Sequence, residues 1–270
     1  MAVIDKDGVL AGKVVIVTGA SRGIGEAIAL RYAMEGARVV VSARTVEDSD
    51  HYLPGTITTT AKTITDAGGD AIAVKCDLAV PEDRERLLSE TRDRLGPVDI
   101  LVNNAAVTWL VPVSEFTEKR FRTMMDVQVW APFELAQACL PSMMERGEGW
   151  ILNISSHGAI HPDVTARRGG GGTVYGMCKA ALERFTTGLA QEVYDSGIGV
   201  NVISPGFIAT PGVIHHKLIN DDNEDTLIPV EDMAEACLRL CYGDPKTLTG
   251  RIDYADEVIE EFSLKPAELL

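Results

Sequence analysis

Short runs of apolar residues alternate with longer amphipathic segments along most of the 270-residue chain. The apolar runs are rich in Val and Ile and almost unbroken, which is typical of strands buried on both faces of a parallel sheet. Six runs are predicted as strands: Lys13–Thr18, Arg38–Ala43, Ala71–Cys76, Ile100–Asn103, Trp150–Ser155 and Val200–Ser204. Helical periodicity fills the segments between them and is clearest in Ile24–Glu35, Pro81–Leu95, Glu118–Met144 and Tyr175–Tyr194.

This alternation predicts an α/β fold of the Rossmann type, with a doubly wound parallel sheet and right-handed crossovers. A further run, Thr249–Tyr254, predicts a seventh strand, with a short helix around Asp256–Glu260 after it. We find no internal repeat and no linker, and 270 residues fit one large domain. The prediction is therefore a single domain of about seven strands over residues 1–270, with 1–11 as an N-terminal extension.

Ligands of doubly wound sheets bind at the carboxyl ends of the strands. Two irregular segments, 157–172 and 207–228, follow strand ends in this chain. We therefore expect both to hang over the substrate side of a site.

Composition excludes several classes of function. The formal net charge is −15, from 25 basic and 40 acidic residues, which disfavours nucleic acid as a partner. No apolar run approaches the ~20 residues of a membrane span, and the start of the chain resembles neither a signal nor a transit peptide. The five cysteines form no Cys-x-x-Cys pair, so we expect no metal site and a reducing, cytoplasmic location.

A glycine-rich turn lies where a nucleotide site is expected. Gly19, Gly23 and Gly25 fall between the first predicted strand and its helix. Glycines let the backbone approach a pyrophosphate, and the start of the helix offers free amides and a positive dipole end to it. A plain glycine turn is the alternative, which the strand before and the helix after make less attractive.

Tyr175 and Lys179 are four residues apart in a predicted helix and therefore lie on one face of it. A nearby ammonium favours the phenolate and lowers the pKa of a tyrosine from its usual value of about 10. The pair is thus suited to general acid–base catalysis near neutral pH.

Taken in order, these motifs resemble those of the short-chain dehydrogenase/reductase family, over about Leu10 to Ala255. Other segments match the family in the same order: Asp77-Leu78, Asn103–Ala106, Asn153–Ser156, Pro205-Gly206 and Thr210. The segment Thr45–Ile57, an addition between the second strand and its helix, gives a weaker resemblance to relatives of hydroxysteroid dehydrogenase-like protein 2.

The resemblance implies a role for each matching residue. Ser156 would donate a hydrogen bond to a carbonyl oxygen, Tyr175 would exchange the proton, and Lys179 would tune the tyrosine and hold the nicotinamide ribose. Gln128 replaces the asparagine with which the family usually relays protons to the lysine. The residues implied in cofactor binding are Gly19, Ser21, Arg22, Gly23, Ile24, Gly25, Arg44, Thr45, Asp77, Leu78, Asn104, Ala105, Tyr175, Lys179, Pro205, Gly206, Ile208 and Thr210.

The residues after the second strand bear on the choice of cofactor. Enzymes that use NAD place an acid there to bind the ribose 2′-hydroxyl, whereas this chain reads Ser42-Ala43-Arg44-Thr45. Arg44, with Arg22 from the glycine turn, suits a 2′-phosphate, so we expect NADP rather than NAD. The alternative for Arg44 is an ordinary solvated loop arginine.

The leading hypothesis is an NADP(H)-dependent oxidoreductase that acts on a small-molecule carbonyl or secondary alcohol. Its rival is an NADP-binding scaffold or redox sensor with little turnover. Ser156 and Tyr175 are 19 residues apart, longer than usual in the family, and Ala166–Gly172 accounts for the excess. That excess is a surface loop, or it brings Arg167 and Arg168 to an anionic tail of the substrate. Relatives imply a homodimer or homotetramer built on Glu118–Met144 and Tyr175–Tyr194.

Overall fold

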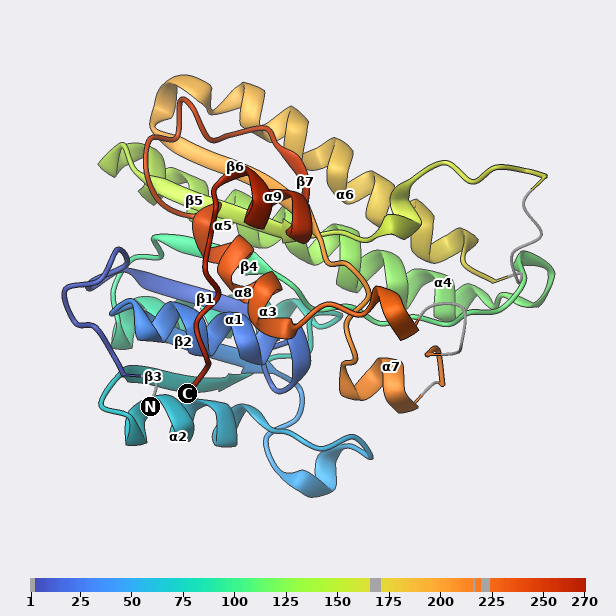
Figure 1. Ribbon diagram of the computed structural model, residues 1–270, viewed down its shortest axis with the longest axis horizontal. Helices are drawn as coiled ribbons and strands as arrows, with labels where there is room; N and C mark the ends of the chain where they lie inside the picture. Colours follow the sequence, from blue (N-terminus) through green and yellow to red (C-terminus); the bar gives the residue numbers. More distant parts are fainter. Residues whose placement is uncertain (1–2, 166–170, 216, 220–223) are drawn as a thin grey trace.

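One parallel sheet of seven strands organises the chain (Figure 1). The computed structural model describes residues 3–165, 171–215, 217–219 and 224–270. The strand order is β3-β2-β1-β4-β5-β6-β7, and every neighbouring pair is parallel. The strands are β1 Val14–Thr18, β2 Arg38–Ala43, β3 Asp70–Lys75, β4 Ile100–Asn103, β5 Gly149–Ile154, β6 Ile198–Ser204 and β7 Ile252–Tyr254. The predicted doubly wound α/β fold is confirmed.

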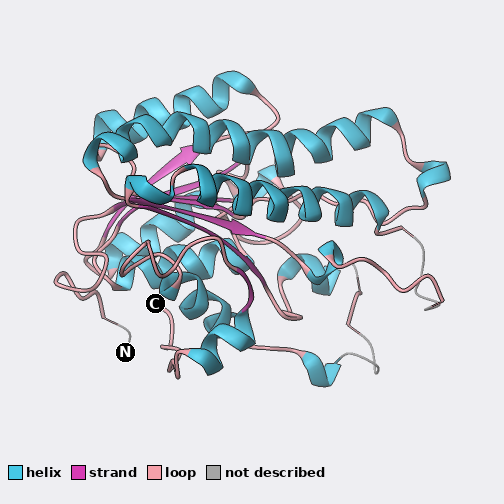
Figure 2. Cartoon of the chain, turned by 90° about the horizontal axis from the view of Figure 1, so that it is seen from above, coloured by secondary structure: helices cyan, strands magenta, loops and turns pink. Residues whose placement is uncertain are grey.

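Helices cover both faces of the sheet, and Figure 2 shows it between two helical layers. The helices are α1 Gly23–Met34, α2 Ile57–Asp66, α3 Pro81–Arg94, α4 Glu118–Met125, α5 Ala131–Arg146, α6 Thr173–Glu192, α7 Pro211–His215, α8 Val230–Arg239 and α9 Ala255–Glu261. The alternation of side chains in β1 explains the two layers. Val15 and Val17 belong to the core under α1, α2, α8 and α9, whereas Val14 and Ile16 belong to the core under α3, α5 and α6.

The helix predicted over Glu118–Met144 is interrupted. Asp126–Trp130 forms a π-helical turn between α4 and α5. Such turns place an extra residue in a helix and are frequent at functional sites. The sequence pattern missed this turn because its hydrophobic positions continue across it. The strand boundaries differ by a few residues, most at β7, which has three residues where six were predicted.

Buried polar contacts join α1, near the start of the chain, to α8, near its end. Arg31 of α1 pairs with Glu235 of α8 at 2.7 Å and with Glu35 of its own helix at 2.7 Å. Next to it, the Tyr32 hydroxyl donates to the Cys237 carbonyl at 2.7 Å. Because all of these residues except Glu35 are buried, the contact fixes α8 against α1 on one face of the sheet.

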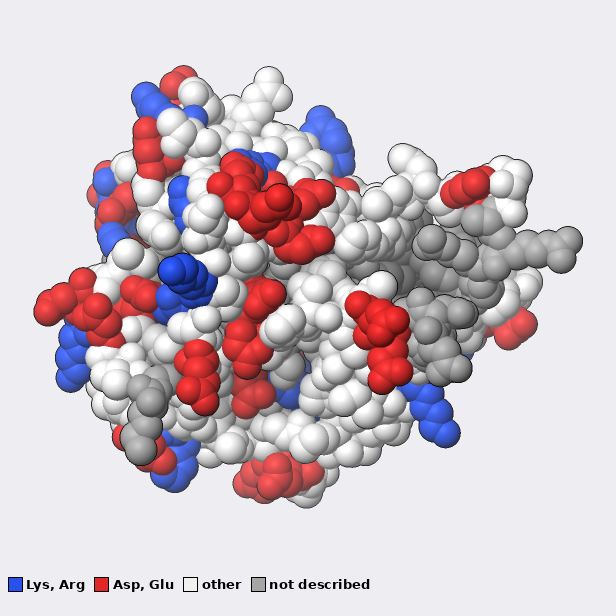
Figure 3. Space-filling view, in the orientation of Figure 1, with Lys and Arg blue, Asp and Glu red and all other residues white. Residues whose placement is uncertain are grey.

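The surface reflects the acidic composition. Acidic side chains cover more of the face in Figure 3 than basic ones, in agreement with the 40 acidic and 25 basic residues of the chain. Within the described part of the chain, no helix combines the length and apolar character needed to cross a bilayer.

Candidate active site

A cavity of about 620 Å³ opens at the carboxyl ends of the strands. It lies where the strand order reverses, between β1 and β4, the place where sheets of this kind bind ligands. The glycine turn forms its floor, and Gly19 has φ +68° there. A Cβ at Gly25 would collide with the Gly19 carbonyl and with the Asn104 amide, so only glycine fits this turn.

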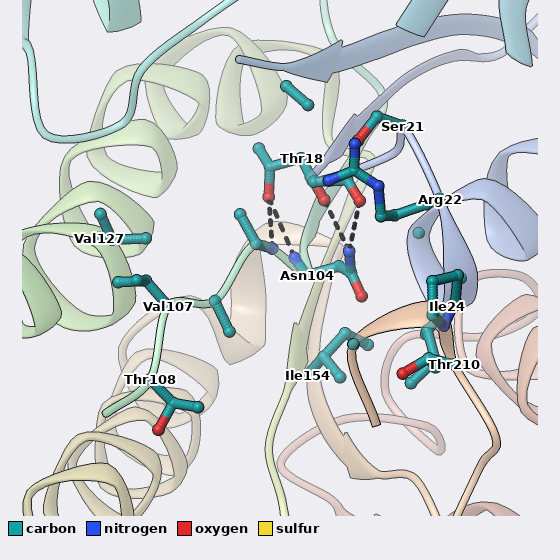
Figure 4. Close-up of a pocket in the computed structure, with 18 of the residues that line it drawn as sticks. Thr18, Ser21, Arg22, Ile24, Asn104, Val107, Thr108, Val127, Ile154 and Thr210 are labelled. Atoms are coloured by element: carbon teal, nitrogen blue, oxygen red, sulfur yellow. Dashed lines mark hydrogen bonds between the residues drawn. The ribbon is translucent and has the colours of Figure 1, made fainter. Parts of the chain in front are cut away.

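Hydrogen bonds fasten the turn after β1 to the loop after β4 (Figure 4). The Asn104 amide group donates to the carbonyl oxygens of Thr18, at 2.8 Å, and of Gly19, at 3.2 Å. The Thr18 hydroxyl accepts from the backbone N–H of Asn104 at 3.0 Å. Asn104 is therefore a structural tie between two walls of the cavity.

The candidate catalytic side chains meet deeper in the cavity. Ser156 follows β5, and Tyr175 and Lys179 come from the first turns of α6. The Lys179 ammonium donates to the Ile154 carbonyl at 2.7 Å and lies 5.6 Å from the centre of the Tyr175 ring. Ser155 has a different partner, because its hydroxyl donates to Glu183 at 2.6 Å. The role predicted for Ser156 stays a prediction.

The electrostatics of this pair differ from the sequence prediction. Burial raises the pKa of the Tyr175 phenol, and a hydrogen bond with Ser156 opposes that shift. Burial also lowers the pKa of Lys179 to about 8. The prediction that Lys179 lowers the tyrosine pKa is wrong for this structure, since desolvation is the dominant effect on both groups.

Gln128 does not line the cavity. It lies buried in the π-helical turn, where its Nε2 donates to the Val107 carbonyl at 2.9 Å. Its Oε1 is buried without a hydrogen-bond partner among the described atoms. Gln128 therefore supports the loop after β4, which carries Val107 and Thr108 on the side of the cavity opposite Arg22 (Figure 4).

At the other end of the cavity, the segment between β2 and α2 forms a wall. Arg22 holds it: Nε donates to the Pro54 carbonyl at 2.8 Å, and Nη2 to the Gly55 carbonyl at 2.8 Å. The same Nη2 is 3.3 Å from the Leu53 carbonyl and 3.2 Å from the Thr45 hydroxyl. The sequence predicted that Arg22 reaches a phosphate, but the structure shows it engaged with this segment. Arg44 is exposed at the mouth of the cavity.

Every residue predicted for the cofactor, including Asp77, Leu78, Pro205, Ile208 and Thr210, lines this one cavity. Their roles stay predictions, because position alone does not establish them. The sequence reasoning missed two parts of the wall. The β2–α2 segment contributes His51, Tyr52 and Leu53, and other parts of the wall are formed by Val107, Leu110, Val127, Phe207, Val213 and Leu218. The extra length of Thr45–Ile57 was the available signal for the first part. The second part comes from loops, the π-helical turn and α7, none of which carries a motif.

The segment Ala166–Gly172, with Arg167 and Arg168, lies mostly outside the described residues, so the predicted contact with an anionic tail is not placed.

A protein-family model described as short chain dehydrogenase matches residues 13–218. Hydroxysteroid dehydrogenase-like protein 2 from Bos taurus is 31% identical over 258 residues, which are 96% of this chain and 60% of that protein. The chain therefore spans less than two thirds of that relative. The 7alpha-hydroxysteroid dehydrogenase of Escherichia coli is 32% identical over 250 residues, covering 90% of this chain and 92% of the enzyme.

The structural comparison agrees with these matches. A gluconate 5-dehydrogenase from Burkholderia cenocepacia, solved in complex with NADP and tartrate, superposes with a TM-score of 0.77. Its sequence is 25% identical, and the superposition covers 90% of this chain and 93% of that one. The likeness thus extends over nearly the whole sheet and both helical layers.

Proposed function

Because this chain belongs to the short-chain dehydrogenase family, whose members here include an oxidoreductase of hydroxysteroids, we propose that it is an NADP(H)-dependent enzyme. It transfers a hydride between nicotinamide and a carbonyl or secondary alcohol. One observation carries the proposal: Ser156, Tyr175 and Lys179 lie in the same cavity as the glycine turn and Arg44. A cofactor bound along that cavity would bring its two ends to these two groups of residues.

The residues present fit NADP. The turn leaves no room for a Cβ at Gly25, as a close approach of pyrophosphate to backbone requires. No acid stands directly after β2, where the chain reads Arg44-Thr45, and Arg44 is exposed where a 2′-phosphate would fall. The gluconate 5-dehydrogenase relative was solved with NADP, which agrees with this choice.

When bound, the nicotinamide would supply the hydride. This chain's residues would manage the oxygen of the substrate. Ser156 donates a hydrogen bond to the carbonyl oxygen, and the Tyr175 phenol gives that oxygen its proton. Because burial raises the pKa of Tyr175, the phenol is protonated at neutral pH, which suits a proton donor in carbonyl reduction.

The substrate end of the cavity favours an apolar compound. Opposite Arg22, the loop after β4 and the helical segment around the π-turn line the cavity with Val107, Leu110 and Val127 beside Thr108 and Thr123 (Figure 4). The arginines of the cavity wall, Arg22 and Arg44, lie at the opposite end, and Lys179 faces the Ile154 carbonyl. We therefore propose a carbonyl group on a largely apolar body, such as an oxosteroid, ahead of an oxidised sugar acid.

Turnover of NADPH tests both parts of the proposal. Purified protein is mixed with NADPH and either a 7-oxosteroid or 5-ketogluconate, and the loss of NADPH absorbance is followed, with Tyr175→Phe as the inactive control. We expect oxidation of NADPH with the steroid and little with the acid. Binding of NADPH without oxidation across a broad carbonyl panel would instead favour the scaffold or redox-sensor alternative.

A further inference from the structure

His51 lies at the phosphate end of the cavity, although no motif assigns it a role. It belongs to the β2–α2 segment, residues 45–56, and lines the cavity together with Arg44 and Tyr52. In Figure 1 this segment is the light-blue loop that leaves the sheet below α7.

The segment is fixed at several points. Arg22 binds its carbonyl oxygens, as described above. Gly55, at φ +97°, packs directly against the Ser21 carbonyl of the glycine turn. Within the segment, the Asp50 carboxylate accepts from the backbone N–H groups of Val46, at 2.8 Å, and Glu47, at 3.1 Å. The first two contacts fix the segment against the glycine turn. The last one engages Asp50, the carboxylate nearest His51 in sequence, in hydrogen bonds to the backbone.

The imidazole itself is held in one orientation. Its Nδ1 accepts a hydrogen bond from the Leu53 N–H at 3.1 Å, and its ring stacks on Tyr52 with centroids 4.2 Å apart. Tyr52 in turn contacts the ring of His215 of α7 at 4.6 Å. Because Nδ1 is an acceptor, the neutral ring carries its hydrogen on Nε2, which makes it a donor at that atom.

The charges that act on His51 are positive. Burial lowers its pKa, and the nearby charges of Arg22, Arg44 and His215 lower it further. The three acidic side chains of the same segment, Glu47, Asp48 and Asp50, are exposed. A half-buried ring among cations, beside a cavity, is favourable for an anion.

We propose that His51 is a ligand of the 2′-phosphate of NADP(H) and acts with Arg44, in the place that the sequence assigned to Arg22. This inference rests on the proposed function, since it requires that the cavity binds a phosphorylated adenosine. Arg22 is then a positioning residue that presents His51 through the β2–α2 segment.

The sign of the pH dependence follows from linkage. A phosphate dianion at Nε2 favours protonated His51, in which Nδ1 also carries a hydrogen and gives up its contact with the Leu53 N–H. Phosphate binding therefore raises the pKa of the imidazole above the lowered value of the free protein. Affinity for the phosphate therefore increases as the pH falls through the bound-state pKa. The second ionisation of the phosphate near pH ~6 acts equally on a variant, so the ratio of wild-type to variant affinity isolates the imidazole.

Calorimetric titration of the intact protein with adenosine 2′,5′-bisphosphate and with adenosine 5′-monophosphate tests this, from about pH 6 to about pH 8.5. His51→Gln should weaken the bisphosphate roughly tenfold at the acid end and much less at the alkaline end, and leave the monophosphate unchanged. His161→Gln, in an exposed histidine outside the cavity wall, should change neither.

Three outcomes would overturn the inference. If His51→Gln retains the wild-type preference and pH profile for the bisphosphate, only the role of His51 is wrong. If wild-type protein binds both nucleotides equally, the choice of NADP is wrong as well. If it binds neither, the proposed function itself is wrong.

Discussion

At the scale of single residues, burial decides the chemistry of Tyr175 and Lys179. Desolvation penalises the phenolate of one and the ammonium of the other, so both are shifted toward their neutral forms. The roles proposed for Tyr175 as proton donor and for Lys179 as ribose ligand are compatible with these neutral forms. In its neutral form Tyr175 carries the proton that the proposed carbonyl reduction requires.

Tyr175→Phe should lower kcat by roughly 10²–10⁴-fold, because a placed proton donor is worth that much. Cofactor affinity and folding should change little, since the substitution removes one hydroxyl. Tyr194→Phe is the matched control, as its hydroxyl only reaches the Lys246 carbonyl at the surface. Steady-state kinetics and NADPH titration measure both effects, and a variant that keeps more than about half of the wild-type rate would contradict the assignment.

Lys179 should also leave a signature in stability. Its pKa falls from 10.5 to about 8 on folding, so between these values the unfolded chain binds a proton that the folded chain does not. The free energy of unfolding must therefore rise with pH across this window. Below the window, it is reduced by the full cost of burying the charged ammonium. Relative to Lys179→Met, the wild-type free energy of unfolding should increase by about 1 kcal/mol per pH unit between pH ~8 and ~10.

Denaturant unfolding at several pH values measures that difference. Lys119→Met, in an exposed lysine of α4, serves as the control and should show no such trend. If the difference in unfolding free energy between wild type and Lys179→Met stays constant with pH, the pKa of Lys179 is not lowered on folding.

At the scale of elements, the β2–α2 segment depends on its close packing against the glycine turn. A Cβ at Gly55 would collide with the Ser21 carbonyl, in addition to the strain of φ +97°. Gly68, after α2, has a similar φ of +88° but nothing within 4 Å of the added carbon. The two glycines therefore separate backbone strain, about 1–2 kcal/mol, from the steric contact.

Gly55→Ala should lower the melting temperature more than Gly68→Ala and should weaken NADPH, because the displaced segment carries His51 and Leu53 away from the cavity. Gly68→Ala should leave NADPH affinity unchanged. Thermal unfolding and cofactor titration of both variants distinguish them, and equal effects of the two on NADPH would show that the segment is not part of the binding wall.

Elements also mark the limit of what the sequence could predict. The strands and the two helical layers could be predicted from local hydrophobic periodicity. The position of the cavity could be predicted from the glycines after β1, where a side chain would collide with the backbone. The π-helical turn and the position of Gln128 could not be predicted, because apolar residues occur on both sides of Asp126–Trp130 and favour one continuous helix. The contacts of Arg22 depend on carbonyl oxygens of a loop more than thirty residues later. Because every residue has a backbone carbonyl, the sequence does not indicate which ones accept from Arg22.

At the scale of the whole molecule, an aromatic cluster joins α5 and α6 at the surface. Trp130 stacks on Phe133 at 5.6 Å, and Phe133 contacts Phe185 of α6 at 5.7 Å. About half of Trp130 remains exposed, at 49%. Exposed apolar patches on such helices are typical of protein interfaces, so we expect the homo-oligomer predicted from the family to form here, with closed symmetry.

Trp130→Glu should therefore shift sedimentation from a multiple of 29.1 kDa toward the monomer. Val164→Glu, which is 96% exposed and lies in a loop, is the control and should not change the assembly. Wild-type protein that sediments as a monomer at micromolar concentration would contradict the expectation.

The contact between α1 and α8 has a consequence for how the protein is made. Arg31 leaves the ribosome early, yet its partner Glu235 is synthesised 204 residues later. Until then Arg31 has only Glu35 as an ion-pair partner, and the face of α1 that packs on α8 is not covered. Both conditions are unfavourable in a compact state. Helix α1 therefore acquires its native packing only after α8 has been synthesised. Until then its apolar face is exposed, and chaperone binding is most useful in that interval.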